Sequence, residues 1–108
     1  MKLIDCHTHT QFSVDSEADL GMCAERADRL GLAAYAVTDH CECNSWYPAE
    51  HYSDGDDMHD SYRYKDCFLD SVAAVTALKE KYNGKLNLIC GVEMGQPQAA
   101  PEAAAFIN

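Results

Sequence analysis

The sequence has little positive charge. It contains 8 Lys and Arg residues against 18 Asp and Glu residues in a chain of 108, which gives a formal net charge of −10. A chain this acidic is repelled by the phosphate backbone of nucleic acids and by anionic membrane surfaces. Its composition therefore argues against both as partners, and an anionic substrate would need a cation between itself and the protein.

The sequence also lacks the segments that mark export, membrane insertion or phosphate-loop binding. No apolar run approaches the roughly 18 residues of a membrane-spanning helix. Residues 1–5 meet a charge too early for a signal peptide. No Gly-x-x-x-x-Gly-Lys loop is present to cradle a phosphate group. We therefore expect a cytoplasmic protein.

The 6 cysteines are scattered through strand-like and helix-like segments rather than through a loop-rich scaffold. Without a route of export, we expect free thiols in a reducing compartment. Cys41 and Cys43 could supply half of a structural zinc site, but no second pair stands at the spacing of zinc ribbons or fingers. Cys6 and Cys90 lie in apolar strand segments, so we interpret them as buried packing residues and not as nucleophiles.

The hydrophobic pattern alternates between strands and helices. Apolar residues from Leu20 to Leu30 recur with helical spacing, Ser16 is placed to cap that helix, and Gly31 is placed to end it. An almost wholly apolar strand follows, of the type found where helices cover both faces of a parallel sheet. The predicted strands are residues 2–6, 33–38 and 86–92, and the predicted helices are residues 17–30, 64–82 and a third that begins at Pro101.

This β-α-β-α-β-α order predicts an α/β fold with a parallel sheet or barrel. Three strands cannot close a barrel, so we interpret residues 1–108 as a single incomplete domain, the N-terminal part of a larger barrel. Residues 41–64 form a long polar and aromatic loop. Because this loop leaves the C-terminal end of a strand, it could wall a substrate pocket; a solvated surface loop is the alternative.

Residues of the metal-ligand type follow all three predicted strands. His7 and His9 stand two residues apart, so both imidazoles point to the same face of an extended strand. His40 follows the second strand, Glu93 ends the third, and Asp15 can reach back from the loop after the first. Functional residues of α/β barrels gather at this edge. Three imidazoles and two carboxylates predict a site for Zn, Mn or Fe, with Glu93 as a candidate bridge between two ions.

Some of these residues could instead have a purely structural role. A single histidine after a buried strand is commonly a hydrogen-bonded core residue, whereas two imidazoles buried side by side would be costly without a partner. Asp15 could simply support the start of the first helix. Asp39 is expected to hydrogen-bond a neighbouring imidazole and not to bind metal directly. His51 and His59 are assigned to the loop.

Four segments stand in order along the chain: Asp-Cys-His-Thr-His-Thr at 5–10, Ser-Val-Asp at 13–15, Thr-Asp-His at 38–40 and Gly-Val-Glu-Met-Gly-Gln at 91–96. They resemble the opening motifs of the PHP (polymerase and histidinol phosphatase) family, and within it the stand-alone histidinol-phosphatase-type members. The Cys-Glu-Cys-Asn stretch at 41–44 and Gly-Gln-Pro at 95–97 add to the likeness.

The resemblance implies a distorted (β/α)7 TIM-like barrel that hydrolyses phosphate esters with up to three metal ions. It assigns His7, His9 and Glu93 to one ion, with Glu93 bridging to a second, and it assigns Asp15 and His40 to the third. A metal-activated water would be the nucleophile, so no catalytic residue beyond the ligands is expected. The family takes further ligands from later strands, including histidines, and no histidine follows His59 here.

The function that the resemblance favours is hydrolysis of a small phosphate monoester, with histidinol phosphate of histidine biosynthesis as the leading substrate and Arg63 as a candidate phosphate-binding residue. A PHP-type nuclease or proofreading phosphodiesterase is one alternative, although the acidic balance and the lack of a basic aromatic groove argue against it. An amidohydrolase also opens with His-x-His, but commonly bridges its metals with a lysine that these strand ends lack. The last alternative is an inactive metal-binding fragment that needs the remainder of a barrel.

Overall fold

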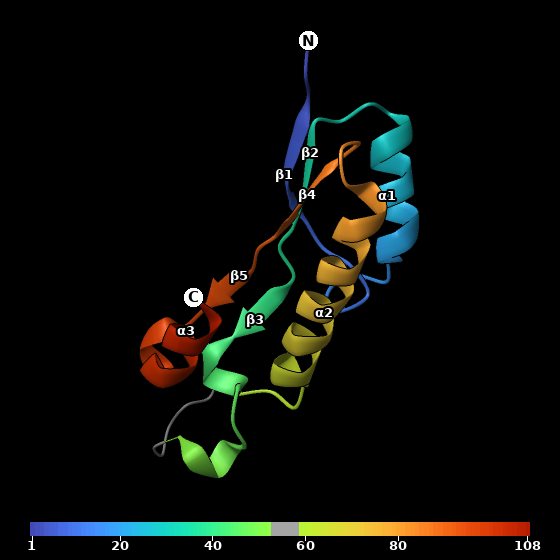
Figure 1. Cartoon of the computed structure of the whole chain (residues 1–108). Helices are drawn as coiled ribbons and strands as arrows, with labels where there is room; N and C mark the ends of the chain where they lie inside the picture. The colour runs from blue at the N-terminus through green and yellow to red at the C-terminus, as the bar shows by residue number, and fades with distance from the viewer. Residues whose placement is uncertain (53–58) are drawn as a thin grey trace.

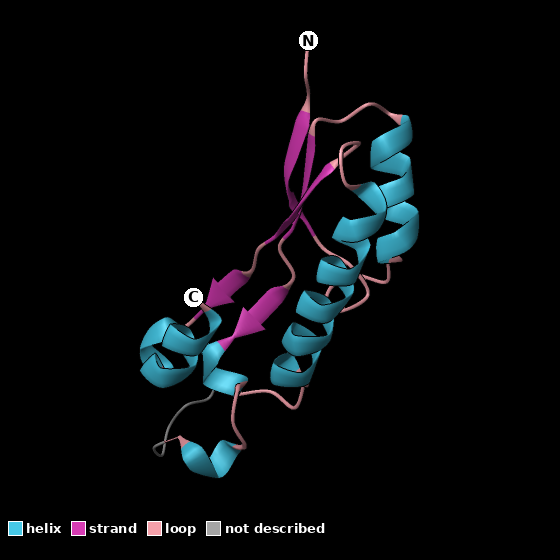
Figure 2. Cartoon of the chain, viewed as in Figure 1, coloured by secondary structure: helices cyan, strands magenta, loops and turns pink. Residues whose placement is uncertain are grey.

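The structure is a computed structural model that describes residues 1–52 and 59–108. Strands and helices alternate along most of the chain, as the sequence predicts (Figures 1 and 2). The strands are β1 (Ile4–Thr8), β2 (Ala34–Val37), β3 (His40–Glu42), β4 (Asn87–Cys90) and β5 (Glu93–Gly95). The α-helices are α1 (Leu20–Arg29), α2 (Tyr64–Tyr82) and α3 (Pro101–Ile107), and the short 3-10 helices are η1 (Cys43–Ser45), η2 (Ala49–His51) and η3 (Pro97–Ala99).

The strands form two small parallel sheets. The first has the order β1-β2-β4, and the second pairs β3 with β5. Sequential strands that pair in parallel need a helical crossover, and α1 and α2 supply these crossovers. The predicted α/β class with a parallel sheet is therefore confirmed.

The second sheet continues the first after a short break, which the sequence pattern does not indicate. Residues 38–39 separate β2 from β3, and residues 91–92 separate β4 from β5. Gly91 lies at this break, where a Cβ atom would come within 3.2 Å of the Thr38 methyl group. His40 and Glu93 were expected to follow the ends of strands. They do lie just beyond β2 and β4, and they also open the second sheet as a cross-strand pair.

Both long helices pack on the same face of the three-stranded sheet (Figure 1). The core between them is built from apolar residues of α1, β2, α2, β4 and the position just before β4: Leu20, Ala24, Ala27, Tyr35, Val37, Val75, Tyr82, Leu86 and Leu88. On the opposite face Ile4 is 58% exposed and Ile89 is 40% exposed. The expectation that helices cover both faces is wrong for the described residues. In a barrel this uncovered face of the strands would be the interior.

Two details of the first 30 residues also differ from the prediction. Asp19, and not Ser16, caps α1, because its carboxylate accepts a hydrogen bond from the Met22 N–H at 2.8 Å. Ser16 instead donates its hydroxyl to the carbonyl of His9 at 3.1 Å. The first strand both begins and ends two residues later than predicted, at Ile4–Thr8, so His7 lies inside β1. Gly31 ends α1 with a φ of +72°, the left-handed conformation expected of a helix-stopping glycine.

The predicted long loop is partly regular. Its described residues contain β3, η1 and η2, and they pack with α3 into a second apolar cluster. The buried members of that cluster are Cys41, Cys43, Trp46, Tyr64, Ala100 and Ala103. Residues 53–58 of the loop lie outside the described residues. No helix in the described part of the chain is both long and apolar enough to cross a membrane.

Candidate metal centre

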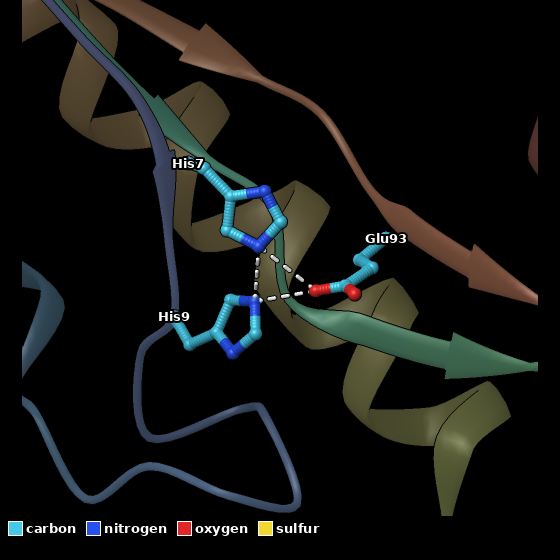
Figure 3. Close-up of side chains that lie close together, drawn as sticks. All are labelled: His7, His9 and Glu93. Atoms are coloured by element: carbon cyan, nitrogen blue, oxygen red, sulfur yellow. Dashed lines mark hydrogen bonds and ion pairs between the residues drawn. The ribbon is translucent and has the colours of Figure 1, made fainter.

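Three ligand-type atoms meet at one point where the two sheets join. The Nε2 atoms of His7 and His9 lie 3.0 Å apart, and Glu93 Oε2 lies 2.9 Å from the first and 2.8 Å from the second (Figure 3). His7 lies in β1, His9 is the first residue after β1, and Glu93 is the first residue of β5. Glu93 is thus brought together with two histidines that precede it in the sequence by 84 and 86 positions.

A second group of ligand-type atoms shares His9 with the first. The Nδ1 atom of His9 lies 2.9 Å and 3.0 Å from the two carboxylate oxygens of Asp15. The Nε2 atom of His40 lies 3.2 Å from Asp15 Oδ2 and 3.7 Å from Glu93 Oε2. All five residues predicted as ligands therefore lie in one connected arrangement, in the two groups His7-His9-Glu93 and His9-Asp15-His40.

The loop after β1 holds Asp15 in this arrangement. Ser13 is buried, and its hydroxyl donates to Asp15 Oδ1 at 2.8 Å while accepting the His40 N–H at 3.1 Å. A turn in which the Ser13 N–H donates to the Thr10 carbonyl at 2.9 Å shapes the loop. Asp15 is therefore fixed between the two histidines and does not serve as a cap for α1.

The protonation of His9 tests whether these groups suit a cation. A carboxylate can only accept hydrogen bonds, so Asp15 places the proton of a neutral His9 on Nδ1. The lone pair on Nε2 then faces Glu93 Oε2 at 2.8 Å, and two lone-pair atoms that close repel each other. A divalent ion between the donors removes this conflict, because both lone pairs would then face its positive charge. The donor set of imidazoles and carboxylates fits a metal such as Zn²⁺.

The same contacts shift the carboxyl pKa values. The Ser13 hydroxyl is the largest influence on Asp15; together with His9 and His40 it outweighs partial desolvation and lowers the pKa from 3.8 to about 2. Desolvation acts to raise the pKa of Glu93, but the three histidines together outweigh it and the net shift is downward. Both groups are thus held as carboxylates, the form that binds metal.

Removing the Ser13 hydroxyl is expected to raise the pKa of Asp15. The unfolded value is near 3.8 and the folded value about 2, so Asp15 stabilises the metal-free fold above about pH 4 and loses that contribution as the pH falls toward 2. In Ser13→Ala the stability that ionised Asp15 contributes should be smaller, so less stability is lost as the pH falls from about 4 toward 2. Carboxyl NMR titration of the chain in a chelator measures the pKa directly, and an unchanged Asp15 titration would contradict the assignment.

The Asp39 carboxylate has partners other than the imidazoles. It is only 5% exposed, and its carboxylate accepts hydrogen bonds from the N–H and the hydroxyl of Thr10 and from the hydroxyl of Ser71. Its carbonyl accepts the Glu93 N–H at 3.1 Å. No described imidazole is hydrogen-bonded to its carboxylate. The predicted partner was therefore wrong, although Asp39 still fastens the segments that carry His9, His40 and Glu93.

Arg63 is not brought to the two groups. Its guanidinium donates to Asp66 at 2.7 Å and 2.9 Å, and its side chain is 76% exposed. The assignment of Arg63 to phosphate binding stays a prediction.

Sequence reasoning gave no role to three residues that the structure places around the ligands. Ser13 and Ser71 donate to carboxylates, and Glu42 Oε1 lies 3.4 Å from His40 Nδ1. Glu42 had a usable signal, because it stands two residues after His40 on one strand and so shares its face. Ser71 had none, since its contact with Asp39 spans 32 positions.

The cysteines are free thiols in the structure. Cys6 is exposed, so its interpretation as a buried packing residue is wrong; it lies on β1, whose side chains are largely uncovered. Cys90 is partly buried, and burial raises the pKa of its thiol. Burial also raises the pKa of Cys41 to about 12. Among the residues described, no metal-type group contains a cysteine.

The model of the PHP domain family matches residues 5–107. The chain belongs to the PHP family. No curated protein matches this PHP chain.

Among solved structures, the PHP chain is similar to histidinol phosphate phosphatase from Lactococcus lactis subsp. lactis, which was solved with zinc, L-histidinol and phosphate. The TM-score is 0.70 at 24% identity, and the match covers 98% of this chain and 35% of that one. The chain thus spans about a third of the length of that protein. Its fold is that of part of a distorted TIM-like PHP barrel, as predicted.

Proposed function

We propose that the chain provides the His and carboxylate ligands of a metal-dependent phosphoesterase. The single observation that carries the proposal is the pair of groups that share His9, in which the imidazole nitrogens and carboxylate oxygens of each group lie within 4.8 Å of one another. Membership of the PHP family supports the proposal.

Each ligand has a distinct task in this proposal. His7, His9 and Glu93 would hold one ion, and Asp15 with His40 would hold another. Glu93 Oε2 lies 3.7 Å from His40 Nε2 as well as close to His7 and His9, which suits a carboxylate shared between ions. Divalent ions bound there supply positive charge beside a phosphoryl group and acidify water. The chain's own contribution is to fix the donors and to keep both carboxyl groups ionised.

Histidinol phosphate is the substrate that we propose. The solved relative was obtained with L-histidinol and phosphate, the two molecules that hydrolysis of this ester would release. The net charge of −10 is compatible with an anionic substrate only if the substrate meets cations first, and the centre would provide them. Arg63 is proposed as an added phosphate contact once its pairing with Asp66 opens. We also propose a cytoplasmic location, in which the 6 thiols stay reduced.

The test is phosphate release from histidinol phosphate by the chain loaded with Zn²⁺ or Mn²⁺. We expect release that depends on the metal and is lost in His9→Ala, while His51→Ala, whose imidazole pairs with Glu102 away from the centre, keeps it. The same samples are offered single-stranded DNA.

The outcomes separate the alternatives. Nucleotide release without phosphate release would favour the nuclease reading. Stoichiometric metal without turnover of either substrate would contradict independent activity and would assign residues 1–108 to a metal-binding part that needs further ligands.

A further inference from the structure

Two motif residues remain without a role once the ligands are assigned. Glu42 belongs to the Cys-Glu-Cys-Asn stretch, and Gly95 begins the Gly-Gln-Pro stretch. The structure places them opposite each other, because β3 and β5 pair in register as His40 with Glu93 and Glu42 with Gly95. In each strand the second residue lies two positions after the ligand and therefore on the same face.

The space above Gly95 is filled by the Glu42 carboxylate. A Cβ atom built on Gly95 would fall 1.8 Å from Glu42 Oε2 and 2.3 Å from its carboxyl carbon. Gly95 is not among the glycines with a positive φ, which are Gly31 and Gly84. A side chain at this position would thus displace the Glu42 carboxylate, whereas the backbone conformation itself does not call for glycine.

The Glu42 carboxylate lies beside Nδ1 of His40, the ring nitrogen that points away from Asp15 and Glu93. Glu42 Oε1 lies 3.4 Å from Nδ1 of His40, while Nε2 of the same ring faces Asp15 at 3.2 Å and Glu93 at 3.7 Å. A neutral imidazole has one proton, so it cannot donate to carboxylates from both nitrogens. Metal-binding histidines generally donate their second ring N–H to a carboxylate or carbonyl, which fixes the tautomer and the ring orientation.

We propose that Glu42 is a positioning residue, which holds the His40 proton on Nδ1 and so directs the Nε2 lone pair toward Asp15 and Glu93, and that Gly95 leaves room for it. The part of this inference that concerns metal binding rests on the proposed function. The tautomer part does not, because it concerns the metal-free ring.

The first experiment reads the tautomer without metal. Long-range 1H–15N NMR of the imidazoles, in a chelator at about pH 8 and so above the ordinary histidine pKa of about 6.5, reports which nitrogen carries the proton. We expect His40 to be the Nδ1–H form in the wild type and to lose this preference in both Glu42→Gln and Gly95→Ala. A His40 tautomer that is the same in all three proteins would overturn the inference.

The second experiment measures Zn²⁺ affinity by equilibrium dialysis. Glu42→Gln and Gly95→Ala should each weaken the ion bound by His40 by roughly 10–100-fold, the usual cost of losing an outer partner of a ligand. The double variant should be no weaker than either single one, because both changes remove the same contact. Glu80→Gln removes the same charge from an exposed position on α2 and should have no effect on Zn²⁺ affinity.

The stability of Gly95→Ala separates positioning from folding. The atoms that its methyl group would meet are the far end of a flexible side chain, so the Glu42 carboxylate can move aside. We expect urea unfolding of metal-free Gly95→Ala to change little while His40 loses its tautomer. Additive affinity losses in the double variant would contradict the shared contact. If the wild type binds no Zn²⁺ but the tautomer shifts as expected, the proposed function fails and the positioning of His40 stands.

Discussion

Replacing His9 with alanine is expected to abolish tight metal binding at both groups, a loss larger than the roughly 10–100-fold cost of an outer-partner change. His9 is the residue that the two groups share, with Nε2 toward His7 and Glu93 and Nδ1 toward Asp15. The substitution removes a direct ligand from the first group. It also removes the partner that holds the Asp15 carboxylate against His40.

The measurement is Zn²⁺ affinity and stoichiometry of His9→Ala beside His51→Ala. The control residue keeps its imidazole outside the centre, in an ion pair with Glu102 at 3.1 Å. Since His9 is only 16% exposed, circular dichroism and urea unfolding must show that both variants fold. Unchanged binding in a folded His9→Ala would mean that the contacts around His9 are ordinary ion pairs of an imidazolium with Glu93 and Asp15.

Replacing Asp39 with alanine is expected to cost about 3 kcal/mol or more of unfolding free energy. Its buried carboxylate is the acceptor for three donors, two on Thr10 and one on Ser71, and each buried donor left without an acceptor costs roughly 1–3 kcal/mol. Thr10 is completely buried and Ser71 is 4% exposed, so water cannot replace the carboxylate without opening the fold. The loss is large against the roughly 5–15 kcal/mol that holds a typical domain together.

Urea unfolding of the metal-free chain measures this loss. Asp70→Ala, on the exposed side of α2, serves as the matched control and should change stability little. Ser71→Ala removes one donor together with its need for a partner, so its loss should be smaller, about 1 kcal/mol. A value for Asp39→Ala equal to that for Asp70→Ala would show that the carboxylate does not tie β1, β2 and α2 together.

The ligands could be predicted from the sequence because they combine two independent signals. Each is a His or carboxylate. All but Asp15, which lies in the loop after the first strand, follow or end an apolar stretch of strand length, which in an α/β fold brings them to a common edge. The structure brings all five predicted ligand residues together. Their binding of metal stays a prediction.

What the sequence could not predict depends on contacts distant in the chain. The sequence predicts the end of the second strand at Thr38, but not that pairing resumes at His40, because β3 pairs with β5, a strand far away in the chain. Asp39 was expected to reach a neighbouring imidazole, and its real partner Ser71 lies on a helix 32 positions away. The exposure of Cys6 follows from the side of the sheet that no described helix covers, which periodicity within one strand cannot reveal.

The most direct test of the central claim is elemental analysis for zinc, manganese and iron in the purified chain and in its His7→Ala form. His7 is 62% exposed, so its removal should leave the fold intact while it removes a ligand. The account predicts near-stoichiometric metal in the wild type and a clear loss in His7→Ala. Equal metal content in the two proteins, or none in either, would contradict the claim that the converging histidines and carboxylates form a metal centre in this chain.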